Sequence, residues 1–183
     1  MIRESLLRRD SRYARYVMCN EIKKRKPMTF KIEKAIEILE RTPLTIETLL
    51  KGISEEWLKS NEGENTWSPY GIVGHLIHGE KTDWITRARI ILSGSENKTF
   101  IPFDRYAQKN ENQETPIEEL LEEFKERRSE SLKELKSLQI DNSKLEEKGI
   151  HPELGEVNLK ELLSTWVVHD LSLIHISEPT RPY

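Results

Sequence analysis

Apolar residues recur at helical spacing in four separate stretches of this 183-residue chain, and this pattern restricts the fold more than any other feature of the sequence. The first stretch holds Ile32, Ala35, Ile36 and Leu39, which share one face of a helix. No stretch shows the alternation of apolar and polar residues that a half-buried strand requires. The sequence therefore predicts an all-α protein, and a four-helix bundle buries four such faces most simply.

Capping residues and prolines mark where these helices begin. Thr42-Pro43 predicts a kink or restart within a long first helix. Ser68-Pro69 opens a second helix that runs to about Leu92, and Thr115-Pro116 opens a third. Asn158 is placed to cap the fourth.

The connection between the second and third predicted helices, residues 95–114, is long enough to cross over the length of a bundle. It contains Phe100, Phe103 and Tyr106, which we expect to pack the connection across one end of the bundle. Before the fourth helix, the segment His151 to Gly155 predicts a turn, and we expect His151 to fix it.

Charge and cysteine content exclude several classes of protein. Residues 28–170 hold 19 Lys/Arg against 28 Asp/Glu, and this acidic balance argues against nucleic acid as a partner. The single cysteine, Cys19, excludes an internal disulfide and a cysteine-rich zinc module. No apolar run reaches the length of a membrane span and no secretory signal is evident, so we expect a cytoplasmic protein without membrane contact.

The two ends of the chain differ from the middle. Residues 1–27 hold nine Lys/Arg against three Asp/Glu and no sustained apolar period, so we predict a non-native or disordered basic extension. The alternative is a basic targeting or nucleic-acid-binding arm. Eleven residues, Leu171 to Arg181, match the one-frame translation of a transposase-based sequencing adapter. We therefore predict that residues 171–183 are adapter-derived, that the domain spans residues 28–170, and that its last helix is truncated.

Two of the five histidines lie where a bundle places functional side chains. His75 stands among apolar residues in the second predicted helix, and His169 lies near the end of the fourth, three residues after Trp166. Imidazole is a good neutral ligand for zinc, nickel or iron. From spacing alone, each histidine fits an ordinary half-buried position better than a metal site.

The motifs around these histidines resemble those of the DinB/YfiT-like superfamily. Trp67-Ser68-Pro69 followed by Gly74-His75-Leu76 is similar to the second-helix pattern of that family, and the segment from Trp166 to Leu171 is similar to its last-helix pattern. The resemblance covers roughly Met28 to Asp170. It implies a four-helix bundle with a long crossover connection, which commonly binds a divalent metal through three histidines.

The resemblance assigns two of those ligands, His75 and His169. The third would be the second histidine of a His-x-x-x-His pair, at position 173, one turn after His169 on the same face. The sequence has Leu173 there, and His175 lies about 240° from that face by helix geometry. We therefore expect zinc, nickel or iron to bind this chain only weakly.

The resemblance also implies a function for the intact parent protein. It implies a divalent-metal-dependent enzyme acting on a small molecule, such as an S-transferase that uses a low-molecular-weight thiol. Three protein nitrogens leave coordination positions open, which is typical of catalytic sites. Because residues 28–170 contain no cysteine, the thiol would come from a cosubstrate. The alternative is a non-catalytic bundle that serves as a stress-linked interaction or dimerisation module, and a homodimer is compatible with either function.

Three carboxylates near the histidines have two interpretations each. Glu80 and Asp83 are either hydrogen-bonding partners of the metal ligands or surface charges. Asp170 either orients the ring of His169 or faces solvent. His78 lies one turn after His75, and we favour an exposed or outer position for it over a place in the pocket around the metal site. We expect Trp67 and Trp166 to anchor the core.

Overall fold

The computed structural model describes residues 29–61, 63, 66–104, 107 and 115–176, so the basic head, Tyr106 and the last seven residues lie outside it. The elements in chain order are α2 (Ile32–Leu39), α3 (Thr42–Leu50), α4 (Glu55–Lys59), α5 (Pro69–Thr82), α6 (Trp84–Leu92), α8 (Ile117–Ser137), α9 (Asn142–Leu145), β1 (Lys148–His151), β2 (Gly155–Asn158) and α10 (Leu159–Ile176). Within these residues, no helix combines the length and apolar character that a membrane crossing needs.

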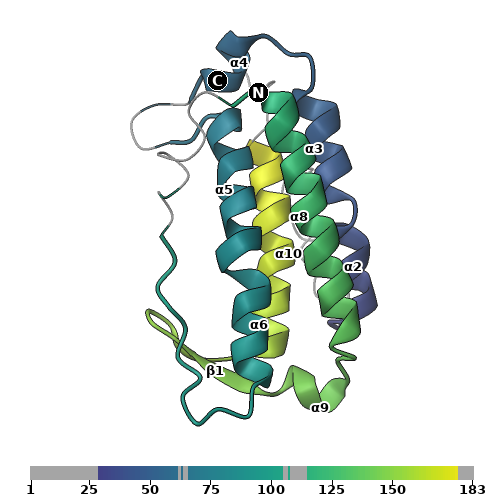
Figure 1. Ribbon diagram of the computed structural model, residues 1–183, viewed down its shortest axis with the longest axis vertical. Helices are drawn as coiled ribbons and strands as arrows, with labels where there is room; N and C mark the ends of the chain where they lie inside the picture. The colour runs from purple at the N-terminus through teal and green to yellow at the C-terminus, as the bar shows by residue number, and fades with distance from the viewer. Residues whose placement is uncertain (1–28, 62, 64–65, 105–106, 108–114, 177–183) are drawn as a thin grey trace, which may run out of the picture.

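Four helical legs lie side by side and form a bundle (Figure 1). The legs are α2 with α3, α5 with α6, α8, and α10. In Figure 1 the leg of α5 and α6 runs from the upper to the lower end, and α8 runs in the same direction. Helix α8 therefore begins at the end of the bundle opposite to the one where α6 ends, and this confirms the predicted four-helix bundle with a long crossover.

Local signals in the sequence set the helix starts. The Ser68 side chain accepts a hydrogen bond from the backbone N–H of Gly71 at 3.2 Å, and Pro69 is the first residue of α5. At the start of α10, Asn158 Oδ1 accepts from the N–H of Glu161 at 2.8 Å, and Glu161 Oε2 accepts from the N–H of Asn158 at 2.9 Å. This reciprocal pair is a capping box. These starts agree with the predictions.

We predicted a single helix for the second leg, but the structure has two. It breaks at Asp83, whose φ of −112° and ψ of −82° lie outside the helical region. The two halves, α5 and α6, still follow one leg of the bundle (Figure 1), and apolar residues on both sides of the break are buried.

The expectation that the chain has no strands was wrong for one short hairpin. Strands β1 and β2 pair antiparallel, with His151 opposite Gly155. Four residues each are too few to show a clear alternation. The turn itself was predicted, and His151 Nδ1 accepts from the N–H groups of Glu153 and Leu154 at 3.1 and 3.2 Å, which confirms its role.

The core consists of two apolar clusters separated by one polar layer. The lower cluster gathers around Leu39, Trp84 and Trp166, and the upper cluster around Ile46, Phe124 and Leu173. At the level between them each leg contributes a buried polar side chain; the four are Thr42, Glu80, Arg128 and Asp170. A layer of this kind must satisfy its own hydrogen bonds, because it lies too deep for solvent to do so.

Helix α10 continues beyond Asp170, where we predicted truncation, and runs to Ile176. Leu173 is 8% exposed and belongs to the upper cluster. A segment of any origin can extend a helix if its apolar residues fall on the core face. The assignment of residues 171–183 to an adapter therefore stays a prediction.

Candidate metal centre

The fold brings the two predicted ligand residues together. His75 lies in α5 and His169 in α10, and their Nε2 atoms are 3.1 Å apart. His75 is 6% exposed, whereas the side chain of His169 is 26% exposed. His75 thus faces the interior, whereas part of the His169 side chain reaches the surface of the described structure.

Aromatic rings surround the pair. The ring of Trp67 lies 4.2 Å from that of His75, centroid to centroid, and Phe103 meets His75 edge-on at 5.4 Å. Trp84 lies 5.2 Å from His169 and stacks on Trp166 at 5.7 Å. Trp166 is fully buried and anchors the core as expected. Trp67 is half-buried and packs both against the upper apolar cluster and on the imidazole of His75.

Phe103 was expected to pack the crossover connection across an end of the bundle. Its ring lies instead beside two histidines: it contacts the ring of His75 at 5.4 Å and that of His78 at 5.1 Å, centroid to centroid. His78 is half-buried and reaches this aromatic wall rather than the His75–His169 contact. Phe100, in contrast, is buried in the lower cluster, where its backbone N–H donates to Ile150 O at 2.9 Å.

The spacing of the two Nε2 atoms suits a shared metal ion. A tetrahedral zinc ion with Zn–N bonds of about 2.0–2.1 Å holds its nitrogen ligands about 3.3 Å apart. The observed 3.1 Å is close to that value. No group of three or more His, Cys, Asp or Glu side chains that could hold a metal occurs among the described residues, and Leu173 occupies the position one turn after His169. The pair therefore supplies two ligands, and its role in metal binding stays a prediction.

The rear edge of His169 faces Asp170. His169 Nδ1 lies 3.7 Å from Asp170 Oδ1, and both atoms are buried. Within the described part of the chain, neither atom has a partner at hydrogen-bond geometry. Asp170 is 0% exposed, so the alternative in which it faces solvent was wrong.

The other oxygen of Asp170 belongs to the polar layer. Arg128 donates from Nη1 to Asp170 Oδ2 at 2.6 Å and from Nε to Glu80 Oε1 at 2.9 Å. Arg128 Nη1 also donates to the backbone oxygen of Leu39 at 2.9 Å. The side chains of Arg128 and Glu80 are each 1% exposed, so the interpretation of Glu80 as a surface charge was also wrong.

Arg128 is the residue that the sequence analysis missed. Its helix is rich in Glu, Lys and Arg, and a charged stretch of this kind is typical of a solvated face. A signal was nevertheless present, because Arg128 stands four residues after Phe124 and four before Leu132, on the apolar stripe. Its guanidinium lies 5.1 Å from the ring centroids of both Phe124 and Trp166.

The carboxyl groups of the polar layer have opposite pKa shifts. Burial would raise the pKa of Asp170, but the charge of Arg128 and polar contacts with His169, Arg128 and Thr42 hold it below its ordinary value. For Glu80, burial outweighs Arg128 and raises the pKa. The two carboxylates keep the pKa of Arg128 raised despite its burial. Of the two carboxyl groups bound to Arg128, Asp170 is therefore the one that ionises more readily.

Asp83, at the break between α5 and α6, is also buried. Its Oδ1 lies 2.5 Å from Arg87 Nε, and the guanidinium of Arg87 lies 5.2 Å from the ring of Phe100. Burial raises the pKa of Asp83, and the charge of Arg87 opposes that rise. Asp83 is therefore an internal ion-pair partner near His169, and its interpretation as a surface charge was wrong.

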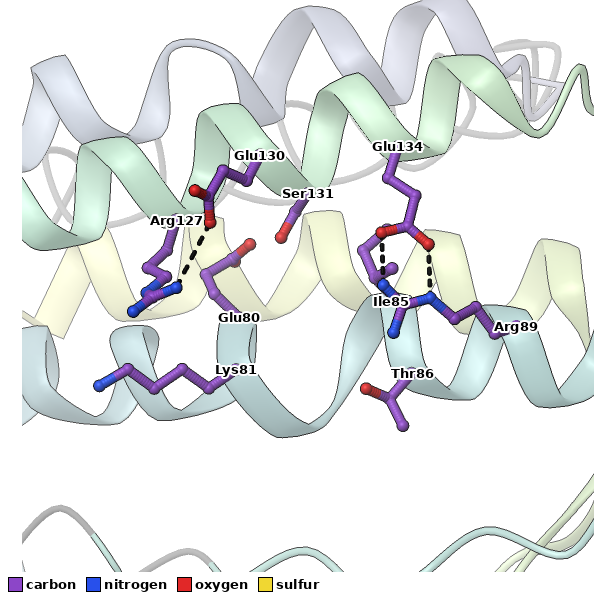
Figure 2. Close-up of a pocket in the computed structure, with 9 residues that line it drawn as sticks. All are labelled: Glu80, Lys81, Ile85, Thr86, Arg89, Arg127, Glu130, Ser131 and Glu134. Atoms are coloured by element: carbon purple, nitrogen blue, oxygen red, sulfur yellow. Dashed lines mark hydrogen bonds and ion pairs between the residues drawn. The ribbon is translucent and has the colours of Figure 1, made fainter.

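A groove of about 230 Å³ lies between the leg of α5 and α6 and helix α8 (Figure 2). Arg89 closes one part of it with two N–H donors to Glu134, each at 2.5 Å, and Arg127 pairs with Glu130 at 3.4 Å. Figure 2 shows the carboxylate of Glu80 directed toward Ser131 on α8. The groove therefore reaches the polar layer at Glu80, while neither histidine lines it.

Comparisons with known proteins identify relatives of this bundle. The sequence model of the DinB superfamily matches residues 38–172. YfiT from Bacillus subtilis, described as "a probable metal-dependent hydrolase with an unusual four-helix bundle topology", is similar in structure, with a TM-score of 0.69, 17% identity, and coverage of 85% of this chain and 90% of YfiT. The four-helix bundle protein TT2238 has a TM-score of 0.51 and 19% identity over 79% of this chain and 96% of its own. No curated protein sequence matches the chain.

Proposed function

The chain belongs to the DinB superfamily, and from this premise we propose that it is the metal-binding bundle of a divalent-metal-dependent enzyme that acts on a small molecule. The observation that supports the proposal is the 3.1 Å approach of the Nε2 atoms of His75 and His169 from two separate legs of the bundle. The description of YfiT as a probable metal-dependent hydrolase is consistent with it.

Each group around the pair has a role in this proposal. His75 and His169 would hold the metal through Nε2. The rings of Trp67, Phe103 and Trp84 pack on the imidazoles and limit the access of water to them. A divalent ion bound there would act as a Lewis acid and lower the pKa of a coordinated thiol or water.

We further propose that the reaction is the transfer of a low-molecular-weight thiol. The sequence has one cysteine, Cys19, which lies outside the described residues, so the described bundle supplies no thiol of its own. A cosubstrate thiol such as bacillithiol or mycothiol would serve as the nucleophile. Hydrolysis, named for YfiT, is the competing reaction and would use water in the same position.

Metal affinity tests the site directly. We expect isothermal titration of the full chain with Ni²⁺ to show weak binding that His75→Ala removes, because two imidazoles alone hold the ion. Leu173→His should tighten binding by more than about 100-fold, since even an outer partner of a ligand contributes about 10–100-fold.

The matched control is Leu173→Gln, which places a polar side chain of similar size at the same position without an imidazole. Equal tightening by Leu173→Gln, or the absence of Ni²⁺ binding in both the parent chain and Leu173→His, would overturn the metal site. Circular dichroism of each variant would establish that the bundle is folded before titration.

The reaction is tested on the Leu173→His chain loaded with Zn²⁺ or Ni²⁺. With bacillithiol and monochlorobimane, thiol transfer predicts a fluorescent thioether whose formation requires the metal and is lost in His169→Gln. Metal-dependent hydrolysis of p-nitrophenyl acetate that is unaffected by added thiol would favour the hydrolase over the transferase.

A further inference from the structure

Two buried polar atoms face each other behind the histidine pair, and neither has a hydrogen-bond partner in the described residues. They are Nδ1 of His169, which can donate a hydrogen bond when protonated, and Oδ1 of the Asp170 carboxylate, which can only accept one. The two atoms are 3.7 Å apart. A closer approach of about 0.5 Å would bring them within hydrogen-bond range. Buried polar groups are rarely left unsatisfied, so this near-contact calls for an explanation.

We propose that Arg128 and Asp170 form a positioning unit that fixes which nitrogen of His169 carries the proton. Arg128 holds Asp170 Oδ2 and thereby directs Oδ1 at the rear edge of the imidazole. The proton of neutral His169 then resides on Nδ1. Its Nε2 is left with a free lone pair that faces Nε2 of His75.

The contact between the two histidines follows from this arrangement. Two Nε2 atoms at 3.1 Å cannot both donate or both accept a hydrogen bond. If Asp170 keeps the His169 proton on Nδ1 in the metal-free chain, His75 is the donor and His169 the acceptor. The tautomer of His169 therefore sets that of His75 across the gap between α5 and α10. A metal bound by Nε2 of both residues would require the His75 proton to move to Nδ1.

Arg128 can perform this function because its own position is fixed from three sides. It donates to Asp170 and to the backbone oxygen of Leu39, and its Nη2 lies 2.8 Å from Glu80 Oε1. The rings of Phe124 and Trp166 pack against the guanidinium at 5.1 Å. A buried, planar group held in this way keeps the carboxylate of Asp170 in one orientation.

The consequence for metal binding rests on the proposed function. A metal ligand needs a free lone pair, and a carboxylate on the opposite ring nitrogen both provides it and raises the basicity of the imidazole. Arg128 and Asp170 are positioning residues in this proposal, since both act through His169.

Asp170→Asn gives the sharpest test. Arg128 has donors only, so the single oxygen of Asn must face it, and the Asn amide N–H must face His169 Nδ1. Nδ1 then has to accept, which moves the imidazole proton to Nε2. The substitution therefore inverts the tautomer of His169, an effect that a merely structural residue would not produce.

The measurement is a long-range ¹H–¹⁵N spectrum of the full, metal-free chain labelled at histidine, at about pH 8.5, where imidazoles are neutral. The His169 signals are assigned from their loss in His169→Gln. We expect the proton on Nδ1 in the parent chain and on Nε2 in Asp170→Asn, with His75 switching in the opposite sense. Glu80→Gln is the matched control, because it changes the other carboxylate bound to Arg128 and should leave His169 unchanged.

The parent spectrum alone can overturn the proposal, since a proton on Nε2 of His169 contradicts it even if Asp170→Asn fails to fold. Inversion by Glu80→Gln as well would also overturn it. Ni²⁺ titration then separates the two proposals. Weakening by about 10–100-fold in Asp170→Asn, against less than about threefold in Glu80→Gln, supports the positioning of a ligand. No Ni²⁺ binding by any variant, with the tautomers as predicted, would overturn the metal site and leave the positioning unit intact.

Discussion

The polar layer and the histidine pair are neighbouring polar regions inside one bundle, yet they are built differently. In the layer, Arg128, Glu80 and Asp170 are almost completely excluded from solvent, and each makes at least one close charge-assisted contact. In the pair, His169 is partly exposed, and its rear nitrogen has no partner at hydrogen-bond geometry in the described residues.

This difference separates a structural element from a candidate functional one. Burying ionised groups is tolerated only when they are paired, so a paired layer fixes how the four legs meet. A site that is to bind a ligand must keep some of its polar atoms available. Asp170 takes part in both regions, with Oδ2 on the layer and Oδ1 on the pair.

The largest predicted effect breaks the layer. Arg128→Met keeps the length of the side chain but leaves Glu80 and Asp170 buried without their cation, so we expect a loss of about 3–5 kcal/mol of unfolding free energy. Urea denaturation at pH 7 measures it. The control is Arg89→Met, which removes the exposed pair with Glu134 and should change stability by less than about 1 kcal/mol. Equal losses would mean that burial is not what distinguishes the layer.

A smaller effect is predicted at the fourth member of the layer. Thr42 is 1% exposed, and its hydroxyl is among the polar contacts that lower the pKa of Asp170. Thr42→Val keeps the shape and removes the hydroxyl, so we expect a loss of about 1.5–3 kcal/mol. Thr48→Val on the same helix removes an exposed hydroxyl that donates to Leu44 O, and it should change stability by less than about 0.5 kcal/mol. A Thr42→Val chain as stable as Thr48→Val would refute the role of Thr42.

The pH dependence of stability sharpens the comparison within the layer. The pKa of Glu80 is raised above 4.5 in the folded chain, so the folded state holds this proton more tightly than the unfolded state. The contribution of Glu80 to stability is therefore fully present below pH 4.5 and declines as the pH rises through the folded pKa. The stability of the parent chain relative to Glu80→Gln should fall from pH 4 to pH 8 in thermal melts. A difference that grows with pH would show that Arg128 outweighs burial.

The smallest stability effect is predicted in the histidine pair. His169→Gln removes a partly exposed ring, and we expect it to change the unfolding free energy by less than about 1 kcal/mol. Asp170→Asn, one residue along, should lose at least about 1.5 kcal/mol, because it weakens a buried charge-assisted hydrogen bond to Arg128. Chemical denaturation of the two variants side by side would test whether Asp170→Asn loses more unfolding free energy than His169→Gln. A larger loss in His169→Gln would contradict the assignment of the layer as the structural region and of the histidine pair as the functional one.

Sequence reasoning located the helices well because their signals are local. Ser68-Pro69 and the Asn158–Glu161 capping box begin helices where they were predicted. The hairpin of β1 and β2 was not predicted, because strands of four residues are too short to show a clear alternation of apolar and polar residues. The burial of Arg128 was not predicted, because a charged residue in a charged helix is normally exposed to solvent. Only its position on the apolar face of the helix indicated that it is buried.

The sequence by itself determined the four helical legs and their starts, since caps, prolines and apolar periodicity act within a few residues of one another. It also singled out His75 and His169 through the resemblance of their motifs. Only the tertiary structure decided that Thr42, Glu80, Arg128 and Asp170 meet at one level, and that Asp170 stands between Arg128 and His169. The partners of a buried charge depend on how distant helices are aligned along the bundle, and no short stretch of sequence records that alignment.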